Sequence, residues 1–427
     1  MIEREVVRLA DIEADRRIRQ RAFELGFDVV GVARADEPLG IEHERYRAFI
    51  DAGMHGSMQY LADHVEARRR LDTPFILEGA RSVVCLGKVY ARSAEAEKND
   101  PPLARLIARY ARGQDYHGFV RKKVRKLAAF IRGLGPDVEA RPLCDVEPIM
   151  ERAFAMRAGI GFVGKNGIVI APGKGSFMLL GEVVTTLELV PDVPMTERCG
   201  SCTRCLDACP TQAFAAPFVL DPRKCISYFT IEHSGAPPED LRDAVGDHFF
   251  GCDVCQEVCP YNRTAPPSAD RTEGFRPLER WTGTRLSEFA SMDEETFSRQ
   301  TQGTPLSRAG RGGLARNAAL VAAKHLERHP GDPDAMELWR TIEAAAAHDD
   351  PAAREVGHAA LERILETRSA VHQDKLDEHA DDSGARAVEN VVQATNVSIQ
   401  GAKFPVNQAS THETDQPVRL RVKRAPA

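Results

Sequence analysis

The spacing of apolar residues predicts a domain of mixed helices and strands in the first half of the chain. Between residues 118 and 135, apolar side chains recur at spacings of three and four, which marks one face of a helix: Val120, Val124, Leu127, Ile131 and Leu134. The runs FDVVGVA at 27–33 and SVVCLGKVY at 82–90 are typical of buried strands. Residues 167–189 predict two strands joined by a Pro-Gly-Lys-Gly turn, as in a hairpin. Mixed helices and strands allow an α/β or an α+β domain, and we expect α/β over residues 1–194.

The pattern changes near residue 195 and again near residue 271. Residues 195–270 hold eight of the ten cysteines and few periodic segments, as expected of a small domain organised by metal clusters. Residues 271–368 contain three helical patterns separated by Pro- and Asp-rich breaks, which favours HEAT-like helical repeats. Residues 369–427 are poor in large apolar side chains, which is typical of a disordered tail. The fold class expected for the whole chain is α+β.

Composition narrows the classes of function. A hydrophobic fraction of 43% and a charged fraction of 28% suit a globular protein of several domains. No apolar run reaches the roughly 20 residues that span a bilayer, and the N-terminus lacks a secretory signal, so we expect a cytoplasmic protein without a membrane partner. The net charge of −6 excludes a strongly basic nucleic-acid binder, so local patches must carry any contact with RNA.

The cysteine spacing predicts two [4Fe–4S] clusters in a ferredoxin-like domain. The segment CGSCTRCLDACP has the spacing C-x2-C-x2-C-x3-C-P, and GCDVCQEVCP supplies a second, shorter run. In bacterial two-cluster ferredoxins the fourth cysteine of each run binds the other cluster. One cluster then takes Cys199, Cys202, Cys205 and Cys259, and the other takes Cys209, Cys225, Cys252 and Cys255. Structural zinc is the competing interpretation, but zinc sites rarely combine this spacing with the following prolines. Of the remaining cysteines, Cys85 suits a buried core thiol and Cys144 stays open.

The partner redox centre is expected in the first domain. No G-x-G-x-x-G after a strand and no Walker A sequence occurs, so neither a dinucleotide fold nor ATP-driven electron transfer is indicated. The densest polar group lies in residues 141–170, with Asp145, Glu147, Glu151 and Arg152. A ferredoxin-like electron-transfer protein without its own chemistry is an alternative, but it leaves this polar group unexplained.

Four features together resemble the epoxyqueuosine reductase family over about residues 17–365. They are the double cysteine run and the segments CDVEPIMERAFAMRAGIGFVGKNGIVI, ARYARGQDYH and RKCISYFTIEHSG. The resemblance implies a cobalamin-dependent reduction of the epoxide of epoxyqueuosine at the tRNA wobble position, with electrons relayed through both clusters. It implies Asp145 as the proton donor, kept protonated because burial raises a carboxyl pKa. From sequence alone, an Asp beside Pro148 is more often a helix N-cap.

The resemblance also implies contacts to a cobalamin held between the first two domains. The expected contacts are Arg69, Asp145, Lys165, Asn166, Val169, Leu180, Ser227, Cys252 and Asp253. A plain turn is the alternative for Lys165 and Asn166, and an internal ion pair is the alternative for Glu151 and Arg152. The segment Asp115-Tyr-His117-Gly-Phe-Val120 begins the cobalt-binding pattern D-x-H-x-x-G but ends in Val, so we expect His117 not to bind cobalt and the cofactor to be base-off.

Partners follow from the same resemblance. A tRNA bearing epoxyqueuosine in its anticodon loop and a small electron donor of flavodoxin or ferredoxin type are expected, with the protein as a monomer. The segment SRAGRGGLARN places three arginines at the start of a helix, where backbone amides add to phosphate binding. The expected RNA contacts are Ser234, Arg308, Arg311 and Arg316. A reductive dehalogenase is the alternative with the same cofactors, but those enzymes are typically exported with twin-arginine signals, which this N-terminus lacks.

Overall fold

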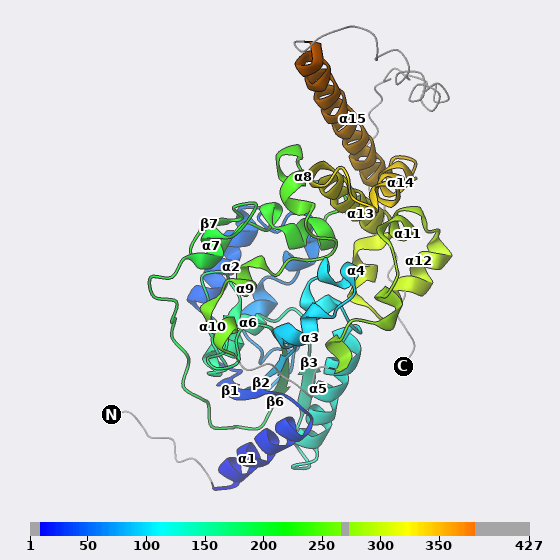
Figure 1. Ribbon diagram of the computed structural model, residues 1–427. Helices are drawn as coiled ribbons and strands as arrows, with labels where there is room; N and C mark the ends of the chain where they lie inside the picture. The colour runs from blue at the N-terminus through cyan, green and yellow to red at the C-terminus, as the bar shows by residue number, and fades with distance from the viewer. Residues whose placement is uncertain (1–8, 266–272, 381–427) are drawn as a thin grey trace, which may run out of the picture. The chain divides into compact units, whose positions relative to one another are not determined.

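The computed structural model describes residues 9–265 and 273–380 of the chain (Figure 1). By their contacts, residues Met1–Glu366 form one compact unit and residues Thr367–Ala427 form a second. No helix in the described ranges is long and apolar enough to cross a membrane.

A four-stranded sheet organises the N-terminal part of the first unit. Its strands are β1 (Val29–Arg34), β2 (Ser82–Val89), β6 (Met178–Thr185) and β3 (Ala140–Leu143), in the spatial order β1-β2-β6-β3. Every neighbouring pair is antiparallel. The chain is therefore α+β as expected, but the α/β label for residues 1–194 is wrong, because an α/β domain is built on parallel strands.

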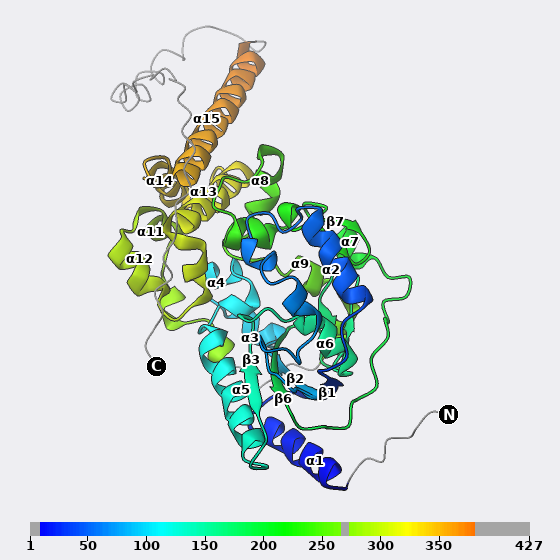
Figure 2. The same cartoon turned by 180° about the vertical axis from the view of Figure 1, so that it is seen from behind.

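Helices cover both faces of this sheet. Helices α1 (Leu9–Glu24) and α5 (Tyr116–Arg132) lie side by side and share a buried cluster with Val32, Val84 and Val183 (Figures 1 and 2). Helix α6 (Glu151–Arg157) packs on the other face with Ala33, Val83, Cys85 and Val184. The alternation of neighbouring residues between the two clusters is the period-two geometry of a strand buried on both sides.

The predicted helix and two predicted strands are confirmed, whereas the predicted hairpin is wrong. Strands β1, β2 and helix α5 fall on the expected segments, and the apolar stripe of α5 is fully buried. The turn after Ile170 does not join two paired strands. Strand β5 (Val169–Ile170) pairs with β4 (Phe162–Val163), while β6 enters the main sheet between β2 and β3.

Short elements make up the remainder of the N-terminal part and the cysteine-rich segment. Between β1 and α5 lie α2 (Ile41–Asp51), η1 (Gln59–Leu61), η2 (Glu66–Arg69), α3 (Ala94–Lys98), α4 (Pro102–Arg105) and η3 (Arg109–Ala111). The cysteine-rich segment contains α7 (Arg204–Asp207), the two-stranded β7 (Phe214–Ala216) and β8 (Val219–Leu220), η4 (Pro222–Lys224), the π-helix η5 (Tyr228–Glu232), α8 (Glu239–Val245), α9 (Val254–Glu257) and α10 (Pro260–Thr264). Such short elements leave the cysteines to define the local fold.

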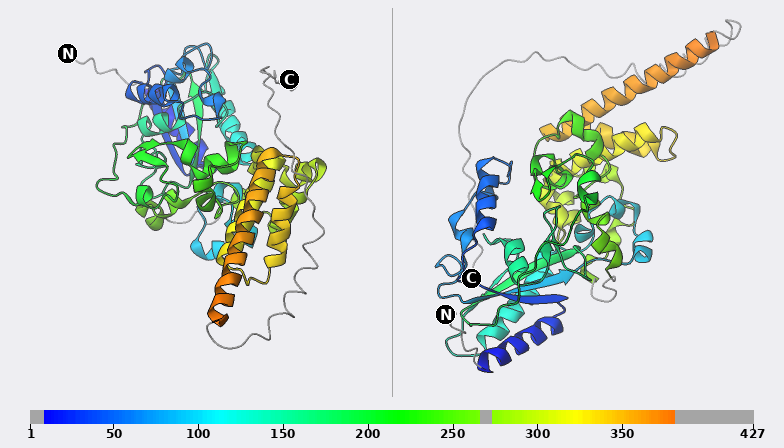
Figure 3. Two further views of the ribbon diagram at one scale, coloured as in Figure 1. Left: turned by 90° about the horizontal axis from the view of Figure 1, so that it is seen from above. Right: turned by 90° about the vertical axis from the view of Figure 1, so that its left-hand side faces the viewer.

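The C-terminal part is helical, as predicted. It comprises η6 (Glu273–Phe275), η7 (Glu279–Trp281), α11 (Leu286–Ser291), α12 (Glu294–Thr301), η8 (Pro305–Ala309), α13 (Gly310–Arg328), α14 (Ala335–Ala346) and α15 (Pro351–Ala380). The first unit includes the start of α15. Helices α11, α13 and α14 pack on one another (Figure 3). Their assignment as HEAT-like repeats stays a prediction.

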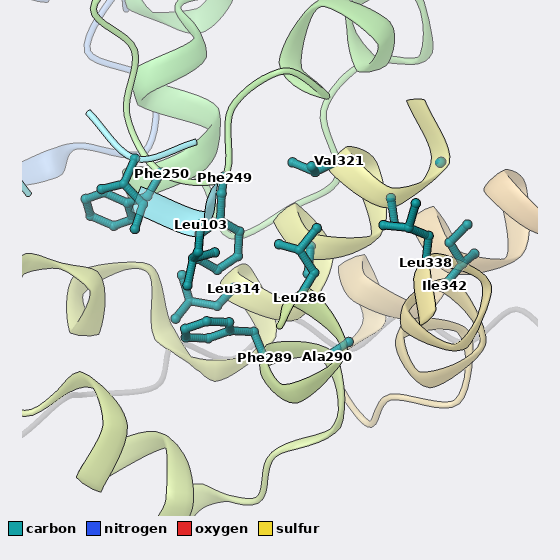
Figure 4. Close-up of a cluster of buried hydrophobic side chains, with 14 of the residues drawn as sticks. Leu103, Phe249, Phe250, Leu286, Phe289, Ala290, Leu314, Val321, Leu338 and Ile342 are labelled. Atoms are coloured by element: carbon teal, nitrogen blue, oxygen red, sulfur yellow. The ribbon is translucent and has the colours of Figure 1, made fainter. Parts of the chain in front are cut away.

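One buried cluster joins these helices to the middle of the chain. Phe289, Leu314 and Ile342 from the C-terminal helices pack with Leu103 of α4 and with Phe249 (Figure 4). Regions expected to be separate domains thus share a core.

The predicted disordered tail is corrected at its start. Helix α15 continues to Ala380, so residues 369–380 are helical. Residues 381–427 lie outside the described residues.

Candidate active site

Asp145 lies in the loop after β3 with a left-handed backbone, at φ 61°. A non-glycine residue in this region is uncommon and marks a position that its surroundings hold in place. Its backbone N–H donates to Oε1 of Glu151 at 2.9 Å. One residue earlier, the N–H of Cys144 donates to Oε2 of Glu147 at 3.1 Å. Two carboxylates therefore fix the backbone of this loop.

The side chain of Asp145 is held by the start of helix α5. Tyr116 donates its hydroxyl to Oδ2 of Asp145 at 2.5 Å, and Nε2 of His117 lies 3.0 Å from the same oxygen. The other ring nitrogen of His117, Nδ1, lies 2.8 Å from Oδ1 of Asp115. Asp115 is the N-cap of α5 and accepts the His117 backbone N–H at 3.0 Å. The histidine ring thus bridges two carboxylates, and its two nitrogens are both engaged.

These contacts correct the expected protonation of Asp145. Burial raises the pKa of the Asp145 carboxyl, but the hydrogen bonds from His117 and Tyr116, together with the positive charges of His117 and Arg308, bring its net pKa below the usual value. The hydrogen bond to Asp145 raises the pKa of His117. Burial, followed by the Asp145 charge, raises the pKa of Tyr116. The mobile proton of this group is therefore held by His117 and not by an isolated aspartic acid.

Three further side chains lie close to Asp145. Arg308 donates from Nε to Glu232 at 2.5 Å, and its guanidinium lies 5.4 Å from the ring centre of Tyr60. Burial and then the negative charge of Glu232 raise the pKa of Tyr60, and the Asp145 charge adds to this effect. Residues from η1, η5 and η8 therefore converge on the face that carries Asp145.

Glu151 and Arg152 do not form the internal ion pair that was weighed for them. Glu151 serves the backbone of Asp145, whereas Arg152 donates from its guanidinium to the carbonyl oxygen of Gly167 at 2.5 Å. The two neighbours thus support two different loops of the site.

The first predicted cluster set surrounds one cavity. Cys199, Cys202, Cys205 and Cys259 line a cavity of about 320 Å³ together with Lys165 and Asn166. Cys259 comes from the second cysteine run, which is the interleaved pattern expected from the spacing. No group of three or more His, Cys, Asp or Glu side chains within the described ranges is close enough to hold a single metal ion. Thiols spread around a cavity suit a cluster better than the converging ligands of a zinc site.

The second set is also brought together. Burial, with smaller contributions from Cys225, Asp253 and Cys209, raises the pKa of Cys252 to about 12. Burial and then Cys252 and Cys225 raise the pKa of Cys255, to which Cys205 of the first set also contributes. The two sets are therefore neighbours, as a short electron-transfer path requires.

Lys165 and Asn166 lie beside the first cysteine set. Lys165 donates from Nζ to the carbonyl oxygens of Gly200 at 2.6 Å and Cys202 at 3.0 Å. Buried Asn166 accepts the Ile168 N–H at 3.2 Å and closes the turn. Lys165 thus holds the loop that carries the cysteines, whereas Asn166 stabilises its own turn, and both line the cavity of the first cysteine set.

The other expected cofactor contacts divide into accessible and buried groups. Arg69 is exposed, and Leu180, Ser227 and Cys252 are half-buried. Val169 and Asp253 are 4% and 6% exposed, and the Asp253 carboxylate accepts from the Arg109 backbone and from Gln256. Contact of Val169 or Asp253 with a cofactor stays a prediction, and protein atoms cover most of both side chains.

The expected RNA contacts also divide by exposure. Ser234 is exposed, and the Arg308 side chain is 52% exposed. Arg311 is paired with Asp349 and lies near Glu294. Arg316 is a wrong prediction as a phosphate contact, because it is 1% exposed and donates to the carbonyl oxygens of three residues: Phe229, His233 and Gly235.

Comparisons with known proteins decide the family. A family model described as "Epoxyqueuosine reductase QueG, DUF1730" matches residues 70–146, and a "4Fe-4S double cluster binding domain" matches residues 198–262. The chain is 37% identical over 345 residues to an epoxyqueuosine reductase of Xanthomonas campestris pv. campestris, covering 80% of this chain and 93% of that protein. The chain belongs to the epoxyqueuosine reductase family. A second relative, from Pseudomonas aeruginosa, is 40% identical over 307 residues, covering 71% of this chain and 83% of the relative.

Solved structures of the family share the fold. An epoxyqueuosine reductase with an epoxyqueuosine-modified tRNA-Tyr stem loop aligns at TM-score 0.71 and 26% identity, covering 91% of this chain and 98% of that one. A Bacillus subtilis epoxyqueuosine reductase aligns at TM-score 0.67 and 28% identity, covering 82% and 94%, and its catalytic aspartate loop is swung out of the active site.

The sequence pointed to Asp145 but missed the side chains that hold it. The sequence gives no role to Tyr116, and it brings in His117 only as a possible cobalt ligand. The segment ARYARGQDYH was the available signal, because Asp115 is a helix N-cap that places the next two residues at the start of α5.

Proposed function

We propose that this chain is an epoxyqueuosine reductase that converts the epoxide of epoxyqueuosine in tRNA to the alkene of queuosine. The observation that carries the proposal is the hydrogen-bonded group of Asp115, His117, Tyr116 and Asp145 in the same unit as two interleaved cysteine sets. Membership in the epoxyqueuosine reductase family is consistent with both features and indicates the substrate.

The reaction needs two electrons and two protons, because the epoxide oxygen leaves as water. As a C–O bond breaks, the oxygen gains negative charge and takes a proton from a nearby acid. Asp145 is the group we assign to this transfer. The proton on Nε2 of His117 passes to Asp145 and from Asp145 to the epoxide oxygen, and Asp115 stabilises the imidazolium that holds this proton at the start. The hydroxyl of Tyr116 is a second donor at the same oxygen.

The residues around Asp145 fit a corrinoid. Val146 is 62% exposed and Tyr60 is 46% exposed beside the Asp145 carboxyl, and half-buried Leu180 accepts a hydrogen bond from the Cys144 thiol at its carbonyl. Exposed apolar surface next to an ionisable group suits the face of a flat macrocycle. Cobalamin, when bound, supplies a strongly nucleophilic cobalt centre. Asp145, Leu180, Ser227, Cys252 and Arg69 are the residues that we propose to hold it.

His117 of α5 would not be available as a ligand for the metal of that cofactor. Both ring nitrogens of His117 are hydrogen-bonded to carboxylates. This arrangement supports a base-off cofactor in which His117 serves the proton and not the metal.

The two cysteine sets would carry electrons from an external donor. Each set holds one [4Fe–4S] cluster in our proposal, and Cys205 and Cys255 lie at the junction between them. Because each cluster takes up one electron at a time, we expect a small one-electron carrier protein of the flavodoxin or ferredoxin type as the donor. We expect the enzyme to act as a monomer.

Arg308 and Ser234 are the RNA contacts that exposure favours. The charge of Arg308 acts on Asp145, and a phosphate would compete with Glu232 for Arg308. Base recognition with the nucleotide turned out of its stack suits a site of this kind.

The direct test is conversion of the substrate. Protein purified without oxygen, loaded with cobalamin and chemically reduced, is incubated with an epoxyqueuosine-bearing anticodon stem loop, and the nucleosides are analysed by mass. Formation of queuosine is the expected result. Intact epoxyqueuosine in the presence of bound cobalamin and reduced clusters would contradict the proposal.

A further inference from the structure

Glu182 is a fully buried carboxyl group in the centre of the sheet. It lies on β6, opposite Cys85 of β2 and Leu143 of β3, and is 0% exposed. Residues 180, 182 and 184 of β6 share one face of the strand, and this face packs against α6. The side chain therefore points from the middle strand toward the first turn of α6, where Glu151 begins the helix.

Neither carboxyl oxygen of Glu182 has a hydrogen-bond partner in the part of the chain that the structure describes. The group that it meets is the carboxyl of Glu151. An ionised carboxylate without a donor in such a site is very costly, and two carboxyl groups can hydrogen-bond only when one of them carries a proton. A proton on one of the two carboxyl groups would therefore allow a hydrogen bond between Glu151 and Glu182 and avoid an ionised carboxylate without a donor.

We propose that Glu151 and Glu182 share a single proton and that this carboxyl pair positions the backbone of Asp145. Glu151 reaches both groups: one of its oxygens accepts the Asp145 N–H, and its carboxyl meets Glu182 below. Glu182 does not touch the side chain of Asp145, so it is a positioning residue that acts through Glu151. The inference rests on the proposed function only for the role of Asp145.

Neighbouring negative charges, the lack of a cationic donor among the described residues and burial all favour a proton shared by Glu151 and Glu182. On the loop after β3, Asp145 and Glu147 carry negative charge toward the pair. Arg121 of α5 is bonded to Glu147 and Arg152 to a carbonyl oxygen, so neither donates to Glu182. On β2, burial raises the pKa of Cys85, which therefore stays neutral. Burial likewise raises the pKa of Glu151 to about 7 and raises that of Glu182.

Loss of the shared proton would weaken the anchor of Asp145. Two adjacent carboxylates repel, and Glu151 would move away from the N–H that it accepts. Asp145 holds a left-handed backbone and needs such a partner to keep it. The swung-out aspartate loop of the Bacillus subtilis relative shows that a loop of this family can adopt a second position.

The test compares Glu182→Gln, which cannot titrate but can still donate to Glu151, with Glu182→Leu, which cannot donate. Glu188→Gln is the matched control on the segment after β6, because its side chain is 51% exposed and paired with Arg81. Glu182→Leu should lower kcat about tenfold with an unchanged KM for tRNA, and Glu182→Gln should stay within about threefold of wild type. Equal kcat values for the Leu variant and wild type would overturn the positioning role.

The shared proton is tested separately from activity. A buried neutral glutamic acid keeps its proton while the unfolded chain releases it, so the wild type loses stability as pH rises above the ordinary carboxyl pKa. Between about pH 5 and about pH 6.5, the Tm of Glu182→Gln relative to wild type should rise by about 2 °C, and that of Glu188→Gln should not change. A flat difference for Glu182→Gln would overturn the proposal whether or not the enzyme reduces epoxyqueuosine.

If Glu182→Gln cannot be purified with its clusters, infrared spectroscopy tests the shared proton in place of the Tm comparison. Difference infrared spectra of wild type near pH 6.5 should show the C=O absorption of a protonated carboxyl group that shifts in frequency in Glu151→Gln, where the protonated Glu182 bonds an amide oxygen instead of a carboxylate. Absence of this absorption in wild type would overturn the shared proton.

Discussion

Nε2 of His117 lies 3.0 Å from Oδ2 of Asp145, and Nδ1 of the same ring lies 2.8 Å from Oδ1 of Asp115. A histidine between two carboxylates is a stable place for a proton, because each carboxylate favours the charged imidazolium. The aspartate that faces the reaction is therefore supplied with a proton from His117 at the start of α5, and the hydroxyl of Tyr116 donates a hydrogen bond to the same oxygen. This relationship leads to the first prediction.

Replacing His117 by Gln should lower turnover by about 10²-fold, because a general acid of this kind contributes on that scale. Cobalamin and iron contents should remain those of wild type, since His117 contacts neither cysteine set in the described structure. Single-turnover rates with the modified stem loop check the prediction. An unchanged rate would remove His117 from the proton path.

The same contact predicts how wild-type turnover depends on pH. Hydrogen bonding to Asp145 raises the pKa of His117 above its ordinary value. The imidazolium, and the stability that it contributes, are fully present below the unfolded pKa and are lost as pH rises through the folded pKa. Turnover should therefore fall on the alkaline side, and His117→Gln should flatten that limb. A limb of the same position and steepness in the variant would contradict this assignment.

Lys165 should be needed for the first cluster. Its ammonium bonds the carbonyl oxygens of Gly200 and Cys202, so Lys165→Met leaves two acceptors unpaired on the loop that carries the cysteines. Iron and sulfide analysis should show loss of about half the iron, since one of two [4Fe–4S] clusters is affected. Exposed Lys174 supplies the control, and Lys174→Met should keep full iron content.

Arg308 and Arg316 should have different roles although they belong to one basic segment. Arg308→Ala should weaken binding of the tRNA stem loop and reduce the salt dependence of binding, with the fold intact. Arg316→Ala should destabilise the protein by about 3 kcal/mol, because three buried carbonyl oxygens lose their donor. Fluorescence binding titrations over a range of salt, with urea unfolding, separate the two effects. An Arg316→Ala variant of wild-type stability would contradict the buried role.

The parts of this protein that the sequence predicted are those with local or periodic signals. The apolar stripe of α5 and the strands β1 and β2 follow from the spacing of apolar residues. The position of Cys259 beside the cysteines of the first run follows from the known pattern of two-cluster ferredoxins. The hairpin after Ile170 failed because strand pairing is a long-range choice: β6 finds β2 and β3, which lie far away in sequence. Apolar pattern alone does not distinguish these partners.

The chemical state of the site was the least predictable feature. The expectation of a protonated Asp145 used burial alone, whereas the contacts from Tyr116 and His117 reverse the net direction of its pKa. Arg316 appeared to be an exposed phosphate ligand because its neighbours are glycines and arginines, yet the helix turns it toward three carbonyl oxygens. Both errors come from tertiary contacts between segments that are remote in sequence.

The central claim is that Asp145 transfers a proton to the epoxide oxygen, and an Asp145→Asn variant tests it most directly. Asn keeps the size of the side chain but cannot give up a proton. Loaded with cobalamin and reduced, the variant should bind the modified stem loop and keep both clusters, while single-turnover formation of queuosine falls by about 10²-fold or more. Queuosine formation at the wild-type rate would contradict the account.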